Sequence, residues 1–343
     1  MKSKLAFRSS LVMAAAVVMA LTSCSGAGTT GTEAASVQLS FSHCCSADTT
    51  WGTAVQQFAR DIEEGSDSTV QLQVVPGSQL AGGDSIKEIE LMQTGDIDMG
   101  VFPIGNISGQ IPQTNFPQLP FLFDSYEHGA RFLTGPYAET MNGWFDDKDL
   151  HVIAYGTAGF RDFVSTEKLF NTPDDIRGAS IRIGAGEVYR ETFEALGTKP
   201  VDIPYGDLYA ALQQGAVNAA ENPATFILND NFYEVAPYLT RVNYMYQPVV
   251  VAVSAKTWDG LDAPTQELLA ETAQSVFGKQ LTDAKNDDDE AVAEMESAGL
   301  TSSRLSAEEL EEYRKVVSPV TETFKDKFGD ELSEFLSAVD ASR

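Results

Sequence analysis

Residues 176–223 read IRGASIRIGAGEVYRETFEALGTKPVDIPYGDLYAALQQGAVNAAENP, and this stretch decides the fold. Apolar and polar residues alternate over Ala179–Ile183, which predicts a short strand with Arg182 on its polar face. A glycine-rich turn leads into a predicted helix, Glu187–Leu196, and a second strand and helix precede a third strand at Ala216–Ala220. This order of strands and helices predicts a parallel sheet in an α/β fold.

Two polar side chains stand at the carboxyl ends of these predicted strands. Arg182 lies at the end of the first, and Asn222 follows the third, which we expect to break at 221–223. Ligands of open parallel sheets gather at such ends, and a guanidinium offers a planar fork that matches a carboxylate. We therefore expect an acid group to bind here. On these residues alone, a surface ion pair for Arg182 and a turn role for Asn222 stay open.

The beginning of the chain has the pattern of a targeting segment. Three basic residues precede an apolar run at 11–21, and Leu21–Cys24 has the pattern of a lipobox. We interpret residues 1–23 as a lipoprotein signal peptide, Cys24 as the lipid attachment site and residues 24–36 as a tether. An ordinary cleaved signal peptide is the alternative.

The composition restricts the partners. The 343 residues carry a formal net charge of −27 at pH 7, which repels nucleic acid and anionic membrane surfaces and is typical of a soluble extracytoplasmic protein. His43, His128 and His151 are far apart in the sequence, and no enzyme or nucleotide-binding motif is complete, so we expect no catalytic site, metal or cofactor. We interpret the adjacent Cys44 and Cys45 as small buried residues; a strained or intermolecular disulfide is the alternative.

The sequence repeats itself at a spacing of 120 residues. Met92–Asp98 matches Leu212–Asn218, each with a helix end, a glycine and the start of a strand, and Pro103 matches Pro223. The repeat predicts two similar α/β lobes whose strands end in loops that face each other across a cleft. Clefts between lobes are a favoured place for small ligands.

The chain is expected to cross between the lobes twice and so to form a hinge. The predicted boundaries are 37–157 plus 248–280 for lobe I and 158–247 plus 281–343 for lobe II. A helix capped by Asp262 and running to about Ser297 should brace both lobes, because it is longer than one small domain is wide. We interpret its acid run at 287–290 as a solvated face.

Several motifs together carry a resemblance. They are LSFSH at 39–43 with WG at 51–52, GDIDMG at 95–100, LPFLF at 119–123, GFR at 159–161, DIRGASIR at 175–182, and LQQGAV at 212–217 leading to ENP at 221–223. In combination they resemble the solute receptors of tripartite ATP-independent periplasmic (TRAP) transporters, in the DctP-like dicarboxylate-receptor family. The resemblance implies a two-lobed periplasmic-binding-protein-like fold with a hinge and a long helix bracing both lobes.

The resemblance also implies a ligand site. The arginine that matches Arg182 holds the ligand carboxylate, and Arg161 matches a second arginine of that site. Asn222 matches a ligand-contacting asparagine, and Tyr205 occupies the position of an aromatic ring that lines the cleft. Residues 183–186 depart from the valine-proline of many members, so the rim there is expected to differ.

Three further ligand-binding residues are predicted from loops that contribute contacts in this family: His43, Phe102 and Asn106. The expected function is capture of a small organic acid by lobe closure and its delivery to the membrane permease. The expected location is the periplasm or the outer face of the cytoplasmic membrane, with a lipid anchor. A sensor subunit for a membrane receptor and a secreted enzyme on the same fold are the alternatives.

Overall fold

The computed structural model describes residues 37–343 of the chain. The predicted signal peptide, the lipid attachment at Cys24 and the tether lie outside the described residues. Within 37–343, no helix combines the length and the apolar character that crossing a membrane requires.

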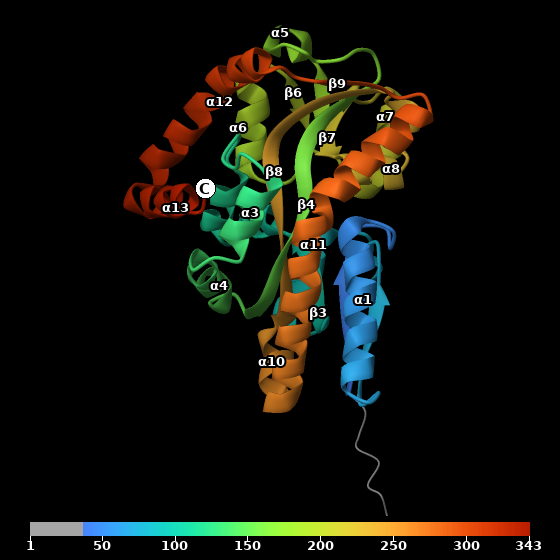
Figure 1. Ribbon diagram of the computed structural model, residues 1–343, viewed down its shortest axis with the longest axis vertical. Helices are drawn as coiled ribbons and strands as arrows, with labels where there is room; N and C mark the ends of the chain where they lie inside the picture. Colours follow the sequence, from blue (N-terminus) through green and yellow to red (C-terminus); the bar gives the residue numbers. More distant parts are fainter. Residues whose placement is uncertain (1–36) are drawn as a thin grey trace, which may run out of the picture. The chain divides into compact units, whose positions relative to one another are not determined.

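One mixed sheet of nine strands organises the described residues (Figure 1). Its order is β2-β1-β3-β8-β4-β7-β5-β6, and β9 pairs with β8 outside this path. The bounds are β1 Val37–His43, β2 Val70–Val75, β3 Met99–Pro103, β4 Leu150–Ser165, β5 Ser180–Arg182, β6 Lys199–Val201, β7 Ala219–Pro223, β8 Tyr238–Ser254 and β9 Thr301–Arg304. The group β1–β3 is parallel, as is the group β5–β7, and each joins the central antiparallel pair β4–β8 in the antiparallel sense.

The register of the central pair brings the two groups of strands together at their carboxyl ends. Strand β3 follows β8 as far as Pro103, opposite Val249. Strand β7 follows β4 as far as Pro223, opposite Arg161. Since Val249 pairs with Gly156 of β4, both groups end within a few residues of each other at the middle of the central pair. The predicted parallel order of 176–223 and the two-lobed α/β fold are confirmed.

Helices cover the sheet in both lobes (Figure 1). They are α1 Thr50–Gly65, α2 Ser85–Thr94, α3 Tyr126–Leu133, α4 Tyr137–Asp146, α5 Pro173–Ile176, α6 Glu187–Ala195, α7 Leu208–Gln213, α8 Ala224–Asn229, α9 Phe232–Val235, α10 Ala255–Gly260, α11 Ala263–Ser297, α12 Ala307–Phe328 and α13 Asp330–Ala341. The predicted long helix is confirmed as α11, whose amide of Thr265 is capped by Asp262. It contacts α1 of the first lobe and α8 of the second.

The two copies of the internal repeat have the same backbone geometry. Gly95 and Gly215 both adopt left-handed conformations, with φ of 73° and 72°. The residue after each glycine then donates its amide to the helix, Asp96 to Leu91 and Ala216 to Ala211, at 2.9 Å in both cases. Glycine is favoured at these helix ends because it lacks the Cβ that makes this conformation costly.

The limits predicted for the strand after Gly215 were wrong. Strand β7 begins at Ala219 and continues through Glu221 and Asn222 to Pro223, where a break was expected. Proline is tolerated at this last position because the strand needs no further amide donor there. The two polar residues before it are therefore held by the ladder with β4.

The interpretation of 287–290 as a solvated face was wrong for one residue. Asp288 is buried, with 2% of its surface exposed, and accepts a hydrogen bond from Nη2 of Arg241. Nε of Arg241 also lies 2.6 Å from Oδ2 of Asp162 on β4. This charged cluster joins α11 to the central strands. Helical periodicity places Asp288 on the same stripe as the buried Ala284 and Ala291, but it cannot reveal the partners Arg241 and Asp162.

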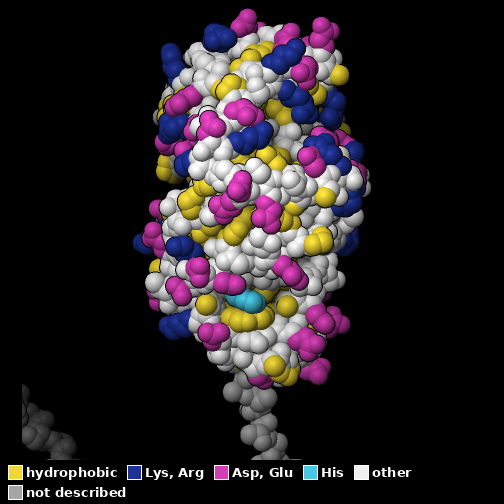
Figure 2. Space-filling model, turned by 90° about the vertical axis from the view of Figure 1, so that its left-hand side faces the viewer, with side chains coloured by type: hydrophobic (Ala, Val, Ile, Leu, Met, Phe, Trp, Pro, Cys, Tyr) yellow, Lys and Arg dark blue, Asp and Glu magenta, His cyan; other side chains and the backbone are white. Residues whose placement is uncertain are grey.

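The surface of the described residues is strongly charged. On the face in Figure 2, Asp and Glu side chains are spread over both halves, with Lys, Arg and hydrophobic side chains between them. An anion that approaches such a surface is recognised only where a positive group is locally uncompensated.

Candidate functional site

Most of the predicted site residues lie where the strands of the two lobes end. His43 is the last residue of β1 and pairs with Val101 of β3. In the other lobe Arg182 is the last residue of β5 and pairs with Ala220, next to Glu221 and Asn222 on β7. The parallel strands thus bring these side chains to the middle of the sheet, as the rule for open α/β sheets predicts.

Arg182 is buried without a counter-ion among the described residues. Its side chain is 9% exposed, and Nε donates to the carbonyl oxygen of Ile203 at 3.0 Å. No carboxylate of residues 37–343 lies within 4.0 Å of it, and neither Nη atom has a hydrogen-bond acceptor there. Burial lowers the pKa of the guanidinium, and the nearby Glu221 opposes this effect. The free side of the guanidinium can take a carboxylate through two parallel hydrogen bonds.

Arg161 is different, because its charge is matched inside the protein. Nε and Nη2 donate to the two carboxylate oxygens of Glu221, with Nη2 2.8 Å from Oε1. Nη1 donates to Oε1 of Gln247, and Nη2 lies 3.1 Å from Oδ1 of Asn222. Burial would lower the pKa of Arg161, but the Glu221 carboxylate outweighs this effect and the pKa lies above its ordinary value.

Glu221 is itself fully buried and has further donors. The Tyr244 hydroxyl lies 2.6 Å from Oε2, and the backbone amide of Gly184 lies 2.8 Å from Oε1. Sequence analysis assigned no role to Glu221, Gln247 or Tyr244. No local pattern could have revealed them, because their partners lie 23 to 86 residues away in the sequence.

The side-chain amide of Asn222 has one paired and one unpaired end. Its Oδ1 accepts from Arg161, while the buried Nδ2 has no partner among the described residues. A buried donor without a partner costs free energy on the order of 1–3 kcal/mol, so this Nδ2 is available to an acceptor from a ligand or from a water molecule.

His43 is completely buried, and neither ring nitrogen has a partner in the described residues. Burial lowers its pKa to about 4, so the ring is neutral at pH 7 and offers one donor and one acceptor. Trp51 of α1 likewise has an unpaired Nε1, and its ring contacts Phe226 of α8 at 5.1 Å between centroids. This contact joins the two lobes beside the ends of the strands.

Tyr205 lies between the arginine and the first lobe. Its ring centroid is 5.6 Å from the guanidinium carbon of Arg182, and its hydroxyl donates to Asp230. The ring also packs against the hydrophobic cluster that contains Cys45, Trp51 and Phe226, and against a second cluster within the second lobe. Tyr205 is therefore placed to position the guanidinium and to close the site from one side.

The structure gives the other predicted contacts different surroundings. The ring of Phe102 is 1% exposed and packs against Phe145 in the core. The Asn106 side chain is partly buried and donates to Oγ of Ser85 at 3.3 Å. Neither placement supports a ligand contact, which for both residues remains a prediction.

The two adjacent cysteines are free thiols. Cys45 is buried and Cys44 partly buried, and their sulfur atoms lie 3.1 Å apart. The interpretation as small buried residues thus holds for Cys45 and only in part for Cys44.

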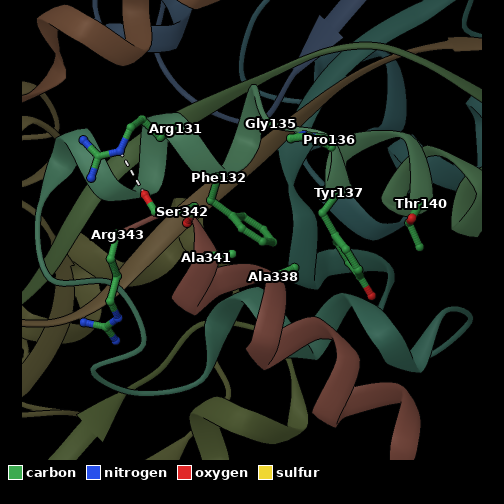
Figure 3. A pocket seen from close by; sticks show the side chains of 10 residues that line it. All are labelled: Arg131, Phe132, Gly135, Pro136, Tyr137, Thr140, Ala338, Ala341, Ser342 and Arg343. Carbon is green, nitrogen blue, oxygen red and sulfur yellow. Dashed lines mark hydrogen bonds between the residues drawn. The ribbon is translucent and has the colours of Figure 1, made fainter.

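A separate pocket of about 500 Å³ lies between α3, α4 and the C-terminal helix α13 (Figure 3). Tyr137 and Arg343 line it, and Nε of Arg131 donates to the carbonyl oxygen of Ser342 at its edge. None of the predicted ligand-binding residues lines this pocket, so it is a different feature from the arginine cluster.

Comparison with known proteins gives consistent results. Residues 41–327 match the model of the family "Bacterial extracellular solute-binding protein, family 7" (DctP). The C4-dicarboxylate-binding periplasmic protein DctP of Rhodobacter capsulatus is 28% identical over 313 residues, which cover 89% of this chain and 91% of that protein. The 2,3-diketo-L-gulonate-binding periplasmic protein YiaO of Escherichia coli is 26% identical over 247 residues, covering 72% and 75%.

A solved structure is similar over nearly the same range. The sugar acid binding protein DctPAm of Advenella mimigardefordensis, in complex with galactonate, superimposes with a TM-score of 0.86. It is 26% identical in sequence, and the match covers 90% of this chain and 99% of that one.

Proposed function

Because this chain belongs to family 7 of the bacterial extracellular solute-binding proteins, we propose that it captures a small organic acid between its two lobes and delivers it to the membrane permease of a TRAP transporter. The observation that carries the proposal is the buried guanidinium of Arg182, which lacks a carboxylate partner in residues 37–343. The relatives named for C4-dicarboxylate and 2,3-diketo-L-gulonate binding support an acid ligand.

Simple energetics support a useful affinity. A hydrogen bond to a charged group contributes about 1.5–3 kcal/mol, and a bidentate pair contributes two of them. Together with apolar contacts made on closure, this can reach about −8 kcal/mol, which corresponds to a micromolar dissociation constant. Exclusion of water by the closed lobes strengthens the ion pair further.

The proposed closure uses the two long central strands as a hinge. Strands β4 and β8 carry the chain between the lobes, and their pairing is irregular between Thr157 and Gly159 and between Arg161 and Phe163. The contact of Trp51 with Phe226 would open with the lobes and admit the ligand.

The same proposal includes the location and the reaction class. The protein acts outside the cytoplasm and is held at the membrane by lipid attached to Cys24. It binds its ligand without converting it, which its membership of a family of solute-binding proteins supports. Mass spectrometry of the ligand after prolonged incubation should recover it unchanged.

Calorimetry with the soluble protein and a series of organic acids tests the acid site. Arg182→Ala should abolish binding, and Arg182→Lys should weaken it at least tenfold, because an ammonium lacks the planar fork. Arg177→Ala is the matched control: this arginine lies in the same stretch but is exposed and paired with Asp174. Unchanged affinity in Arg182→Ala would overturn the proposed site.

A further inference from the structure

The two arginines of the ligand site do not together provide two positive charges for a ligand. Arg161 and Glu221 are buried together and form a bidentate pair, so their net charge is zero. The Arg182 guanidinium is then the only positive charge without a carboxylate partner among the side chains placed at the ends of the strands within residues 37–343.

We propose, on the basis of the proposed function, that the site takes a monocarboxylate bearing hydroxyl or keto groups in preference to a dicarboxylate of the same length. One uncompensated guanidinium balances one carboxylate. A second carboxylate would have to lose its water without gaining a positive partner, which is unfavourable in a buried site. Glu221 is the residue that sets this preference.

The pairing of Arg161 leaves it little capacity for a second carboxylate. Its Nε and Nη2 are bonded to Glu221, and Nη1 is bonded to Gln247. If a ligand carboxylate displaced Glu221 from Arg161, the Glu221 carboxylate would remain buried beside the ligand carboxylate, because Glu221 has no exposed surface.

Glu221 is also fixed from its other sides. It accepts from the Tyr244 hydroxyl at 2.6 Å and from the Gly184 amide at 2.8 Å, in addition to Arg161. Four donor atoms from three residues hold the two carboxylate oxygens in place, so Glu221 stays beside Arg161 when a ligand enters.

Several unpaired polar groups near the strand ends are neutral, among them the Nδ2 of Asn222, the ring nitrogens of His43 and the Nε1 of Trp51. The buried carboxylate of Glu88, which accepts from the hydroxyl of Ser78 next to His43, also has an unpaired oxygen and supplies no positive charge for a second carboxylate. An amide, an imidazole and an indole donate to or accept from hydroxyl and keto oxygens without needing a second charge. A site with one charge and several neutral donors thus matches a hydroxy or keto acid.

Matched ligand pairs test this preference by calorimetry on the wild-type protein at pH 7.5. Succinate and its half-amide succinamate have the same length and differ by one charge, and galactarate and galactonate form a similar pair with six carbons. The monocarboxylate of at least one pair should bind, and at least tenfold more tightly than its dicarboxylate partner. Tighter or equal binding of the dicarboxylates, or binding of no monocarboxylate, would overturn the inference.

The Glu221→Gln variant identifies the residue responsible. It preserves the shape of the side chain and removes its charge, so Arg161 becomes uncompensated and the preference should move at least tenfold toward the dicarboxylate. An unchanged preference in a folded variant would disprove the role of Glu221; if the variant does not fold, the wild-type pairs still decide the preference.

The Arg182→Ala variant separates this inference from the proposed function. If the wild type prefers the dicarboxylate and this binding is lost in Arg182→Ala, only the inference is refuted. Failure of the wild type to bind any organic acid refutes the proposed function as well.

Discussion

Arg161 and Glu221 lie on neighbouring strands and form a buried ion pair, with Nη2 of the arginine 2.8 Å from Oε1 of the glutamate. Arg182, on the next strand beyond Glu221, has no carboxylate within 4.0 Å in residues 37–343. The three strands β4, β7 and β5 therefore place one matched and one unmatched arginine side by side. The Arg161 guanidinium is neutralised by Glu221, whereas the Arg182 guanidinium is the one to which we propose that a ligand carboxylate binds.

Arg161 and Glu221 should stabilise the fold only when both residues are present. Removing one partner leaves a buried charge, so Glu221→Ala is expected to cost about 3–5 kcal/mol in the free energy of unfolding. The double variant Arg161→Met, Glu221→Leu should recover a large part of this loss. Urea denaturation measures both, with Asp174→Ala in an exposed pair as the control, where about 1 kcal/mol or less is expected. Equal losses in the single and double variants would contradict the explanation.

The two repeat glycines should respond differently to alanine. Both have positive φ, so each substitution costs about 1–2 kcal/mol from the backbone alone. At Gly215 a new Cβ meets nothing within 4 Å, whereas at Gly95 it would lie 2.7 Å from Cδ of Lys256. Gly95→Ala should therefore lower the thermal midpoint more than Gly215→Ala.

Gly143 is the matched control for these glycines, because it lies inside helix α4 and its new Cβ would meet no atom within 4 Å. Gly143→Ala should stabilise the protein by about 0.5–1 kcal/mol. A loss of stability at Gly143 equal to that at Gly215 would show that the positive φ is not the cause.

Asp288 should make stability depend on pH. Burial raises its pKa to about 6, despite the neighbouring Arg241. Because the folded pKa lies above the ordinary 3.8, the native state binds the proton more tightly between pH 4 and 6. Protonation of Asp288 therefore raises the free energy of unfolding as the pH falls from 7 toward 5. This stabilisation is lost as the pH rises through 6.

The Asp288→Asn variant should lack this pH-dependent part of the stability. Its free energy of unfolding should change less between pH 7 and 5 than that of the wild type, and at pH 7 it should be close to or above the wild-type value. Arg241→Leu, which leaves Asp162 and Asp288 buried without a cation, should instead be strongly destabilised. A steeper pH dependence in Asp288→Asn would contradict the raised pKa.

The cysteines should report on lobe closure. Cys45 is 4% exposed and belongs to the same hydrophobic cluster as Phe226 of the second lobe. If the lobes open before the ligand enters, a saturating organic acid should slow alkylation of Cys45 at least tenfold, measured by mass spectrometry of its peptide in a Cys44→Ser variant. Equal rates with and without a bound acid would exclude opening at this contact.

Local chemistry alone determined much of this protein. The alternation over 179–183, the glycines at 95 and 215 and the cap at Asp262 specify strands, helix ends and the long helix, because each depends on neighbours within a few residues. Ligands of open parallel sheets bind at the carboxyl ends of the strands, and this rule predicts Arg182 as a site residue from the sequence.

Only the tertiary structure decided which charges remain available. Glu221 was expected at a strand break and Asp288 on a solvated face, yet both are buried against arginines from distant strands. Periodicity and spacing cannot reveal such pairs, since the partners are brought together by strand order and register. The charge of a buried site is a sum over residues that the fold brings together, and that sum leaves Arg182 free while it neutralises Arg161.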